Sequence, residues 1–135
     1  MDCIFCKIIK GEIPCYKLAE NDNAIAFLDI MPVTKGHFLV IPKKHFEFAE
    51  DAPEELMAGL MVLAVKLAAA AKKVLKCDGI NFIINSGKQA GQIIPHVHLH
   101  VVPRYVDDGI IWPWPQGEIS AEAAADLIKS IKNEL

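Results

Sequence analysis

Histidine recurs at every second position in one short stretch of the chain, residues 95–103, which reads PHVHLHVVP. Successive side chains of a β-strand point to opposite faces, so we expect His96, His98 and His100 on one face and aliphatic side chains on the other. Proline is tolerated at the ends of a strand and not inside it, so the two flanking prolines are expected to bound this strand. The pattern predicts a strand that carries a site on its histidine face.

Two kinds of chemistry fit three imidazoles on one strand face. Neighbours on that face lie about 6.6–7 Å apart, so they can converge on one small ligand. The three could ligate a catalytic metal such as zinc and leave one coordination position open. Alternatively, one neutral imidazole is a nucleophile whose neighbours orient it and bind an anion. The third interpretation is that the histidines are only polar residues on a solvated strand face. The remaining two histidines, His37 and His45, flank another strand-like run. This concentration of histidines in two stretches favours a functional site.

The loop before the histidine strand bears on the second kind of chemistry. An imidazole that attacks phosphorus needs its other ring nitrogen held by an acceptor, and the phosphoryl oxygens need donors where charge accumulates. Residues 86–92 (SGKQAGQ) contain two glycines, which permit backbone N–H groups to approach an anion closely. A glycine-bearing hairpin loop has the same composition, so the loop alone does not decide between the interpretations.

Of four cysteines in the chain, only Cys3 and Cys6 have the spacing of a motif. The N-terminus has no charged segment followed by an apolar one, so we expect no signal peptide, a cytoplasmic protein and no disulfide framework. The Cys-x-x-Cys pair is then half of a zinc site, a redox pair or two reduced thiols. A zinc site needs two more ligands, and the candidates with suitable donors are His45, His96, Cys15 and Cys77.

Composition limits the classes of function. A chain of 135 residues, 53% hydrophobic and 23% charged, predicts one globular domain over residues 1–135. The net charge of −3 argues against binding to nucleic acid or to an anionic membrane, although Lys43 and Lys44 are compatible with one bound phosphate. The apolar stretch 56–71 contains Gly59 and Lys66 and is shorter than the ~20 residues that cross a bilayer. It predicts a buried helix of a globular protein.

The elements that must position these groups follow an α+β pattern. Strands are expected over residues 15–19, 24–29, 37–41, 79–85 and 96–102, and a short helical turn over residues 3–10. A long helix is expected to begin near Asp51, with an apolar face formed by Leu56, Leu60, Leu63, Leu67, Ala70 and Val74. Ser120 is the expected N-cap of a last helix that uses Ala123, Leu127, Ile131 and Leu135. This order predicts a five-stranded, mostly antiparallel sheet with the long helix on one face and the histidines on the other.

Five motifs together resemble the histidine-triad (HIT) family of nucleotide-binding proteins. Residues 96–102 (HVHLHVV) match its His-φ-His-φ-His-φ-φ signature, where φ is hydrophobic. Four further stretches resemble the Hint branch, the purine nucleoside phosphoramidase type, in the same order: residues 4–9 (IFCKII), 26–30 (AFLDI), 37–45 (HFLVIPKKH) and 91–92 (GQ). The match covers about residues 3–105, which leaves residues 106–135 as a tail and a helix. The resemblance implies the HIT-like fold and a homodimer in which two sheets join side by side.

The resemblance also implies a purine nucleotide hydrolase. Members of this family hydrolyse nucleoside phosphoramidates or related phosphoanhydrides through a covalent nucleotidyl-histidine and release a nucleoside monophosphate such as AMP or GMP. Carried over, His98 is the nucleophile, His100 contacts the phosphate and His37 orients and polarises the triad. Asp29 accepts from the ribose hydroxyls. The implied nucleotide-binding set is Phe5, Ile8, Asp29, Ile30, Asn85, Gly91, Gln92, Ile93, His98 and His100.

A structural zinc site is a further implication of the resemblance, whereas no organic cofactor is implied. Some relatives bind zinc through a Cys-x-x-Cys pair, the histidine after a Pro-Lys-Lys sequence and the first histidine of the triad. Here these residues are Cys3, Cys6, His45 and His96, a complete set for a closed tetrahedral site. The metal would attach the N-terminal turn to the sheet, and His96 would be a ligand and not a catalytic group.

Two departures from the family pattern bear on activity. Many Hint proteins carry a serine where this chain has Ile93, so a hydroxyl donor is absent, and the expectation is either slower turnover or an altered leaving-group preference. The chain also differs after Arg104, where Trp112 or Trp114 either corresponds to a family tryptophan that reaches the partner subunit's site or packs against the last helix. The favoured function is a purine nucleoside phosphoramidate hydrolase. The alternatives are a nucleotide-binding regulatory protein with little turnover and a metallohydrolase that uses the three histidines as ligands.

Overall fold

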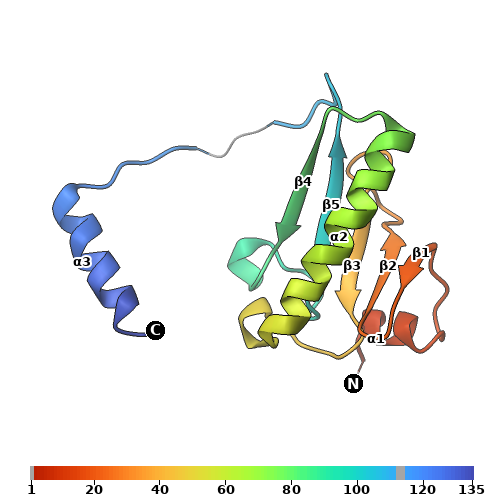
Figure 1. The fold of residues 1–135 in the computed structure, drawn as a ribbon, viewed down its shortest axis with the longest axis horizontal. Coiled ribbons are helices and arrows are strands. Elements are labelled where there is room, and N and C mark those ends of the chain that lie inside the picture. The colour runs from red at the N-terminus through yellow and green to blue at the C-terminus, as the bar shows by residue number, and fades with distance from the viewer. Residues whose placement is uncertain (1, 112–114) are drawn as a thin grey trace.

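The structure, a computed structural model, describes residues 2–111 and 115–135. Its elements, in chain order, are α1 (Ile4–Ile9), β1 (Lys17–Glu20), β2 (Ala24–Leu28), β3 (Phe38–Pro42), the 3₁₀ turn η1 (Ala49–Asp51), α2 (Glu54–Leu75), β4 (Gly79–Ile84), the 3₁₀ turn η2 (Lys88–Ala90), β5 (Leu99–Arg104) and α3 (Ala121–Lys132) (Figure 1). Five strands form an antiparallel sheet in the order β1-β2-β3-β5-β4, and α2 crosses one face of it. The predicted α+β class, with a five-stranded sheet, one long helix and a C-terminal helix, is confirmed.

Local sequence explains where the long helix begins and ends. Pro53 precedes a first turn that carries Glu54 and Glu55, and both proline and acidic side chains suit a helix N-terminus. Lys76 adopts a left-handed φ of 53°, and its N–H donates to the carbonyl of Lys72 over 2.9 Å. The helix therefore begins three residues later than its predicted start near Asp51 and ends with a left-handed cap.

The face of α2 that contacts the sheet centres on Leu60, Ala64 and Ala68, which are buried. Ala70 and Val74, which the periodicity predicts on the same face, are exposed, and this part of the prediction is wrong. Periodicity identifies a helix face but does not show where the sheet beneath the helix ends. Among the residues that the structure describes, α2 included, no helix has the length and apolar character needed to cross a bilayer.

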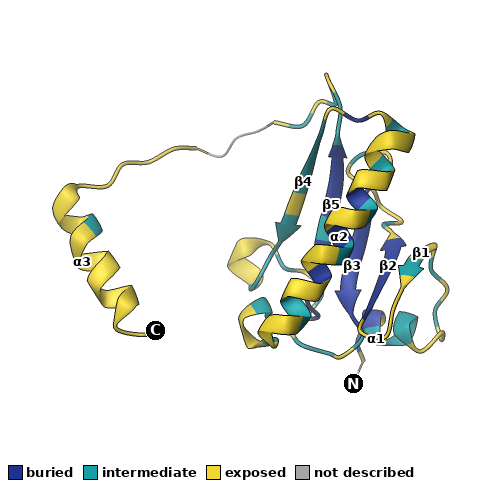
Figure 2. Ribbon diagram, viewed as in Figure 1, coloured by how far each residue is buried: buried dark blue, intermediate teal, exposed yellow. Residues whose placement is uncertain are grey.

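The sheet separates two apolar cores, and its central strands β2, β3 and β5 are buried on both faces (Figure 2). The core under α2 includes Ala26, Val40, Leu99 and Val101. The core on the other face, beneath α1, consists of Cys3, Phe5, Ile25, Phe27, Leu39 and Ile41. Because side chains alternate along a strand, neighbouring residues belong to opposite cores.

The histidine strand differs from the prediction in its limits. β5 covers Leu99–Arg104, so His96 and His98 precede it and Pro103 lies inside it. The proline is tolerated because the pairing of β3 with β5 ends at Val101, so no hydrogen bond from position 103 is needed on that side. The prediction that Pro103 lies outside the strand is therefore wrong. The pairing of β5 with its neighbours, which the sequence does not show, is what makes proline acceptable there.

A glycine permits close approach between the end of α2 and the turn before β3. Gly36 has a φ of +90°, and a Cβ atom at this position would clash with the side chain of Leu75. A residue with a side chain would therefore be strained in both its backbone and its packing. The turn places His37 directly before β3.

The C-terminal helix lies apart from the sheet, on the side of β4 (Figure 1). Its predicted N-cap is present, because Oγ of Ser120 accepts from the N–H of Ala123 over 3.2 Å. No residue of α3 is buried, and the apolar side chains that the sequence assigns to one face are exposed. The predictions for Trp112 and Trp114 fall outside the described residues.

Candidate functional site

The three predicted catalytic histidines, His37, His98 and His100, meet on the sheet face opposite α2. The ring centroids of His98 and His100 are 4.8 Å apart, and those of His37 and His100 are 5.2 Å apart. Asp29, just after β2, places Oδ2 3.6 Å from Nε2 of His37, while its Oδ1 accepts from the N–H of Met31 over 2.8 Å. Four groups from three separate parts of the sequence therefore form one cluster.

Hydrogen bonds fix the tautomers of His37 and His100. The N–H of Val33 donates to Nδ1 of His37 over 3.0 Å, so the proton of this ring is on Nε2. That Nε2–H donates to Nδ1 of His100, also over 3.0 Å. The proton of neutral His100 is therefore on its own Nε2, where it can be donated to an anion.

The adjacent histidine, His98, has the opposite tautomer. Its Nδ1 lies 2.7 Å from the backbone carbonyl oxygen of His96, which can only accept, so the proton is on Nδ1. Nε2 of His98 therefore keeps its lone pair. A fixed tautomer with a free basic nitrogen is what a nucleophilic imidazole requires.

Burial keeps these imidazoles neutral. Burial, together with the nearby rings of His98 and His37, lowers the pKa of His100 to about 4, while Asp29 acts in the opposite direction. Burial also lowers the pKa of His37 and of His98, and Asp29 opposes the shift in both cases. Only the neutral ring has a lone pair, so a lowered pKa keeps a nucleophilic imidazole competent at neutral pH.

The loop between β4 and β5 is held together by the side chain of Gln92. Its Oε1 accepts from the N–H of Gly87 over 2.7 Å, and its Nε2 donates to the carbonyls of Glu47 and Ile94 over 2.7 and 3.0 Å. The N–H groups of Gly91 and Gln92 also donate to carbonyls within the loop. The side chain of Gln92 therefore shapes the loop, and phosphate binding by this backbone stays a prediction.

Two further predicted residues lie at this loop. Gly91 has a φ of +94°, and a Cβ atom on it would come within 3.6 Å of Nδ2 of Asn85. Asn85 directly follows β4 and is half-buried. Ile93 is 91% exposed, so its side chain contributes little to packing within the described structure.

Phe5 is the central residue of the predicted nucleoside pocket. Its ring, 4% exposed, packs edge-on against Phe27 and His98, with centroid distances of 5.7 and 5.3 Å. Ile8 packs half-buried beside the same core, whereas Ile30 is 76% exposed. The apolar part of the pocket is therefore built around α1, while Ile30 lies at its surface.

A second cluster joins the N-terminal turn to the sheet. One ligand atom from each of Cys3, Cys6, His45 and His96 lies within 4.8 Å of the others. Sγ of Cys3 is 3.5 Å from Nδ1 of His96, Sγ of Cys6 is 3.4 Å from Nδ1 of His45, and the two Nδ1 atoms are 3.1 Å apart. A tetrahedral zinc ion with bonds of about 2.0–2.3 Å separates its ligand atoms by about 3.3–3.8 Å. The predicted residues therefore have the spacing of a zinc site.

Donor chemistry also fits zinc. The Nε2–H of His96 donates to the carbonyl of Pro42 over 2.9 Å, so the Nδ1 that faces the cysteines has a lone pair. Burial and the neighbouring Cys3 raise the pKa of the Cys6 thiol, which a bound cation would offset. The other two cysteines, Cys15 and Cys77, belong to no cluster of potential metal ligands in the described part of the chain.

The histidines of the motif do not share one ligand cluster. His96 clusters with the two cysteines, and His100 clusters with Asp29 and His37. Within the described residues, 2–111 and 115–135, His98 belongs to neither of these clusters of potential metal ligands. The interpretation of the motif as a single three-histidine metal site therefore receives no support from the geometry.

The cysteine cluster and the catalytic cluster touch through two residues. His96 contributes its ring to the first and its carbonyl to His98 in the second. Phe5, which lies between the two cysteines in sequence, packs edge-on against both imidazoles, with a centroid distance of 5.8 Å to His96. Ordering of the N-terminal turn is therefore coupled to the orientation of His98.

Sequence reasoning missed four contributors to these clusters. Val33 and Pro42 act through backbone groups, for which no side-chain pattern exists. Phe27 and Leu39 form part of the apolar core beneath α1. Both lie in short, continuous apolar runs, residues 24–28 and 38–41, which are typical of strands buried on both faces and could have indicated them.

The two lysines that the sequence offers as a phosphate site are engaged elsewhere. Nζ of Lys43 lies 2.7 Å from the carboxylate of Glu20, and Nζ of Lys44 lies over the ring of Phe46, 5.4 Å from its centroid. These contacts do not support a bound phosphate at this position.

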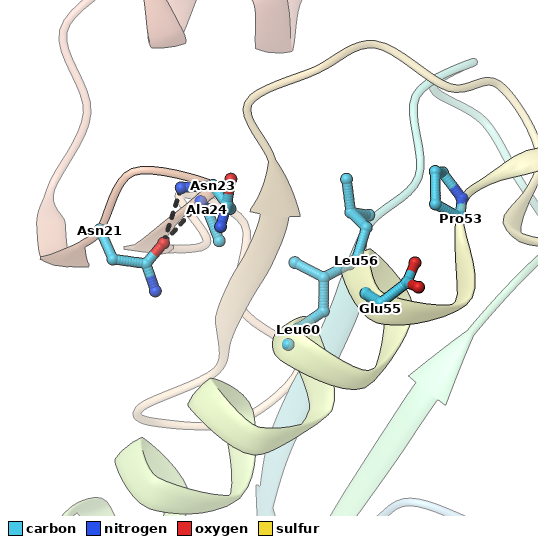
Figure 3. A pocket seen from close by; sticks show the side chains of 8 residues that line it. Asn21, Asn23, Ala24, Pro53, Glu55, Leu56 and Leu60 are labelled. Carbon is cyan, nitrogen blue, oxygen red and sulfur yellow. Dashed lines mark hydrogen bonds between the residues drawn. The ribbon is translucent and has the colours of Figure 1, made fainter.

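A cavity of about 280 Å³ lies on the α2 side of the sheet (Figure 3). The turn between β1 and β2 and the first turns of α2, including Glu55 and Leu56, line it. The side-chain oxygen of Asn21 accepts from the N–H groups of Asn23 and Ala24 over 2.9 and 2.8 Å. No histidine or cysteine lines this cavity, so the histidine face remains the candidate site.

Comparisons with known proteins agree with this geometry. The family model described as HIT domain matches residues 10–107. The chain is 42% identical to adenosine 5'-monophosphoramidase HNT1 of Saccharomyces cerevisiae over 134 residues, which are 98% of this chain and 82% of the yeast protein. A crystal structure of a HIT family member from Bacillus subtilis has a TM-score of 0.93 at 39% identity and covers 100% of this chain and 98% of that one.

A Zn-bound histidine triad family protein from Mycobacterium smegmatis has a TM-score of 0.79 at 38% identity, covering 100% of this chain and 99% of that one. The histidine motif, the antiparallel sheet and these similarities agree with one another. The chain belongs to the HIT domain family.

Proposed function

We propose that the chain hydrolyses purine nucleoside phosphoramidates, or related substrates with an α-phosphoryl group, and releases a nucleoside monophosphate. The observation that carries this proposal is a pair of opposed tautomers, a free Nε2 lone pair on His98 beside an Nε2–H on His100. The first can attack phosphorus while the second stabilises a phosphoryl oxygen. The name of the yeast relative, adenosine 5'-monophosphoramidase, supports the substrate class.

The reaction takes place in two transfers. Nε2 of His98 forms a bond to the α-phosphorus as the bond to the leaving nitrogen breaks, and the leaving amine takes up a proton from solvent. Water then attacks the same phosphorus, the P–Nε2 bond breaks, and a proton passes to solvent. His100 donates to a phosphoryl oxygen in both steps, and His37 holds His100 in the donor tautomer. Two such steps replace one difficult attack of water on an anionic centre.

The remaining predicted residues bind the nucleotide. Phe5 and Ile8 offer an apolar surface to the base, which Ile30 covers from the exposed side. The carboxylate of Asp29 accepts from the ribose hydroxyls. Ile93 gives the leaving-group side no hydroxyl donor, so turnover is slower than in relatives that carry serine there.

Zinc occupies the cluster of Cys3, Cys6, His45 and His96 as a structural ion. When bound, it supplies a cross-link between α1 and the sheet, and no step of the hydrolysis passes through it. The ligand spacing and the Zn-bound relative from Mycobacterium smegmatis support this assignment. Thiol ligands persist in a reducing compartment, which favours the cytoplasm.

A homodimer joins two sheets side by side at β4. This strand is at one end of the strand order, so one of its edges has no partner strand in the described part of the chain. Phe82 of β4 is 38% exposed. An edge strand of six residues with apolar side chains is a surface that pairs readily with another strand.

Incubation with an adenosine phosphoramidate that carries a fluorogenic amine tests the proposed function. We expect release of the amine together with a stoichiometric amount of AMP. If calorimetry shows that the chain binds AMP but no amine is released, the chain would instead be the nucleotide-binding regulatory protein. Activity that is lost on chelation while the melting temperature is unchanged would indicate the metallohydrolase.

The pH dependence of hydrolysis follows from the burial of the histidines. The pKa of His100 is lowered to about 4, and protonation of this ring would place N–H groups of His37 and His100 against each other. We therefore expect the acid limb of kcat/KM to lie below the usual pKa of histidine near 6.5. The groups that face His100 are His37, His98 and Asp29. An acid limb near pH 6.5, measured over a full rate profile, would contradict this expectation.

A further inference from the structure

We propose that Thr34 and Tyr105 are positioning residues for the hydrolysis. They hold the turn whose backbone sets the tautomer of His37, and that tautomer makes His100 a donor. Neither side chain belongs to the catalytic cluster, so each acts through the turn. The effect on rate rests on the proposed function, whereas the effect on the tautomers does not.

The turn between β2 and β3, residues 29–37, is closed by hydrogen bonds of its own backbone. The N–H of Asp29 donates to the carbonyl of His37 over 3.0 Å, which continues the pairing of the two strands. The N–H of His37 donates to the carbonyl of Thr34 over 3.2 Å, and the N–H of Val33 donates to Nδ1 of the same imidazole over 3.0 Å. The turn therefore binds one of the two nitrogens of the imidazole that follows it.

The side chains of the turn give it little packing. Met31 and Val33 are 82% and 58% exposed. Oδ1 of Asp29 fixes only the first residues of the turn, through the N–H of Met31. A segment with few buried apolar contacts opens more readily than the strands around it. The position of the Val33 N–H therefore depends on what else holds the turn.

Thr34 ties the middle of the turn to β5. Its Oγ1–H donates to the backbone carbonyl of Pro103. The pairing of β3 with β5 ends at Phe38 and Val101, so this carbonyl lies beyond the paired residues and is available to a side chain. A Cβ atom on Gly36 would lie 3.4 Å from the Pro103 ring, so the turn runs directly beside this residue. The Thr34 hydroxyl therefore extends the contact between the two strands into the turn.

Tyr105 supplies a second tie from the same end of β5. Its Oη–H donates to the carbonyl of Lys35 over 2.6 Å. The residue is half-buried, and its own N–H donates to the carboxylate of Asp108 over 3.2 Å, so it is itself held in place. Two consecutive turn residues, Thr34 and Lys35, are thus bonded to the segment 103–105.

A displaced turn would change where two imidazoles carry their protons. Without the N–H of Val33 against it, Nδ1 of His37 can carry the proton, and Nε2 then faces His100 as an acceptor. Nδ1 of His100 must then donate, so its Nε2 loses the proton that is proposed to bind a phosphoryl oxygen. The carboxylate of Asp29 lies 3.6 Å from Nε2 of His37, beyond hydrogen-bond distance, so it opposes this change only in part.

Substitutions of Thr34 test the effect on rate. Thr34→Val removes the hydroxyl and keeps the shape of the side chain, whereas Thr34→Ser keeps the hydroxyl. We expect Thr34→Val to lower kcat for an adenosine phosphoramidate about 5-fold, the factor that one neutral hydrogen bond contributes. KM should change little, because a donor to the phosphoryl group matters most where charge accumulates in the transition state. Thr34→Ser should restore the wild-type kcat.

The two tyrosines of the chain offer a matched pair of variants. Tyr105→Phe removes the hydroxyl that bonds the turn and should also lower kcat. Tyr16 is 68% exposed and precedes β1, so Tyr16→Phe should leave kcat unchanged. Circular dichroism melting of every variant shows that it is folded.

Nitrogen NMR measures the tautomers without any turnover. Long-range ¹H–¹⁵N spectra of protein with ¹⁵N-labelled histidine show, at neutral pH, which ring nitrogen carries the proton. His37→Asn and His100→Asn assign the signals. In the wild type we expect the proton on Nε2 of both rings. In Thr34→Val and Tyr105→Phe both rings should shift toward the Nδ1–H form, and Thr34→Ser and Tyr16→Phe should match the wild type.

The spectra separate a positioning role from a merely structural one. Unchanged tautomers in Thr34→Val and Tyr105→Phe would overturn the proposal, even if kcat or the melting temperature falls. A change that Thr34→Ser does not reverse, or that Tyr16→Phe also causes, would overturn it as well. Changed tautomers with an unchanged kcat would refute the role in hydrolysis. If the wild-type protein hydrolyses no phosphoramidate, the proposed function fails, and the spectra still show whether the two hydroxyls set the tautomers.

Discussion

Replacing His98 by alanine is expected to reduce kcat/KM for an adenosine phosphoramidate by roughly 10⁴- to 10⁶-fold, the range seen when an enzyme loses its nucleophile. The variant lacks the Nε2 lone pair that Nδ1–H donation to the carbonyl of His96 leaves free. Intact mass spectrometry of acid-quenched wild-type protein should show a nucleotidyl adduct on His98. The variant should show none.

Controls separate loss of the nucleophile from loss of the site. His100→Ala removes a donor and keeps the nucleophile, so a smaller reduction of about 10²- to 10³-fold is expected. Because His98 is buried, the melting temperature and AMP affinity of both variants must be measured, and His98→Asn offers a second, polar replacement. Turnover near the wild-type rate in either His98 variant would show that the nucleophile is another group.

Removal of zinc is expected to lower the melting temperature by about 10 °C or more. A ligand present at about a thousand times its Kd stabilises the folded chain by about 4 kcal/mol, and a domain of this size loses a few degrees for each kcal/mol. The proposed zinc ion would join Cys3 and Cys6 of the N-terminal turn to His45 and His96. Metal analysis of protein purified without chelator should give one zinc per chain.

Cys3→Ser and Cys15→Ser form a matched pair for this prediction. The first removes a ligand of the cluster and should reproduce the effect of chelation on the melting temperature. Cys15 is half-buried and outside the cluster, so its substitution should leave zinc content unchanged. Because Phe5 and the carbonyl of His96 contact His98, metal-free protein should also have a lower kcat. Equal melting temperatures with and without chelator would refute the structural role.

Most of the fold could be predicted because short apolar runs, helical periodicity and turn residues are local features of the sequence. The continuous apolar runs 24–28 and 38–42 indicated the central strands, and Glu54 with Lys72 and Lys73 marked the two ends of α2. The errors concern neighbours: Pro103 lies inside β5, and Val74 lies beyond the covered part of α2. The residues around Pro103 do not show where the neighbouring strand ends, and those around Val74 do not show where the sheet beneath the helix ends.

The candidate site divides in the same way. The motif spacing in the sequence determined that His98 and His100 lie together, and the Cys-x-x-Cys pair determined that a metal cluster is possible. Only the tertiary structure decided which nitrogens join His37 to His100, and that the carbonyl of His96 sets the tautomer of His98. Tautomers depend on the hydrogen-bond partner at each nitrogen, and these partners are backbone groups or rings from distant segments. The sequence alone therefore named the reactive side chains, whereas the fold determined which nitrogen of each is free to react.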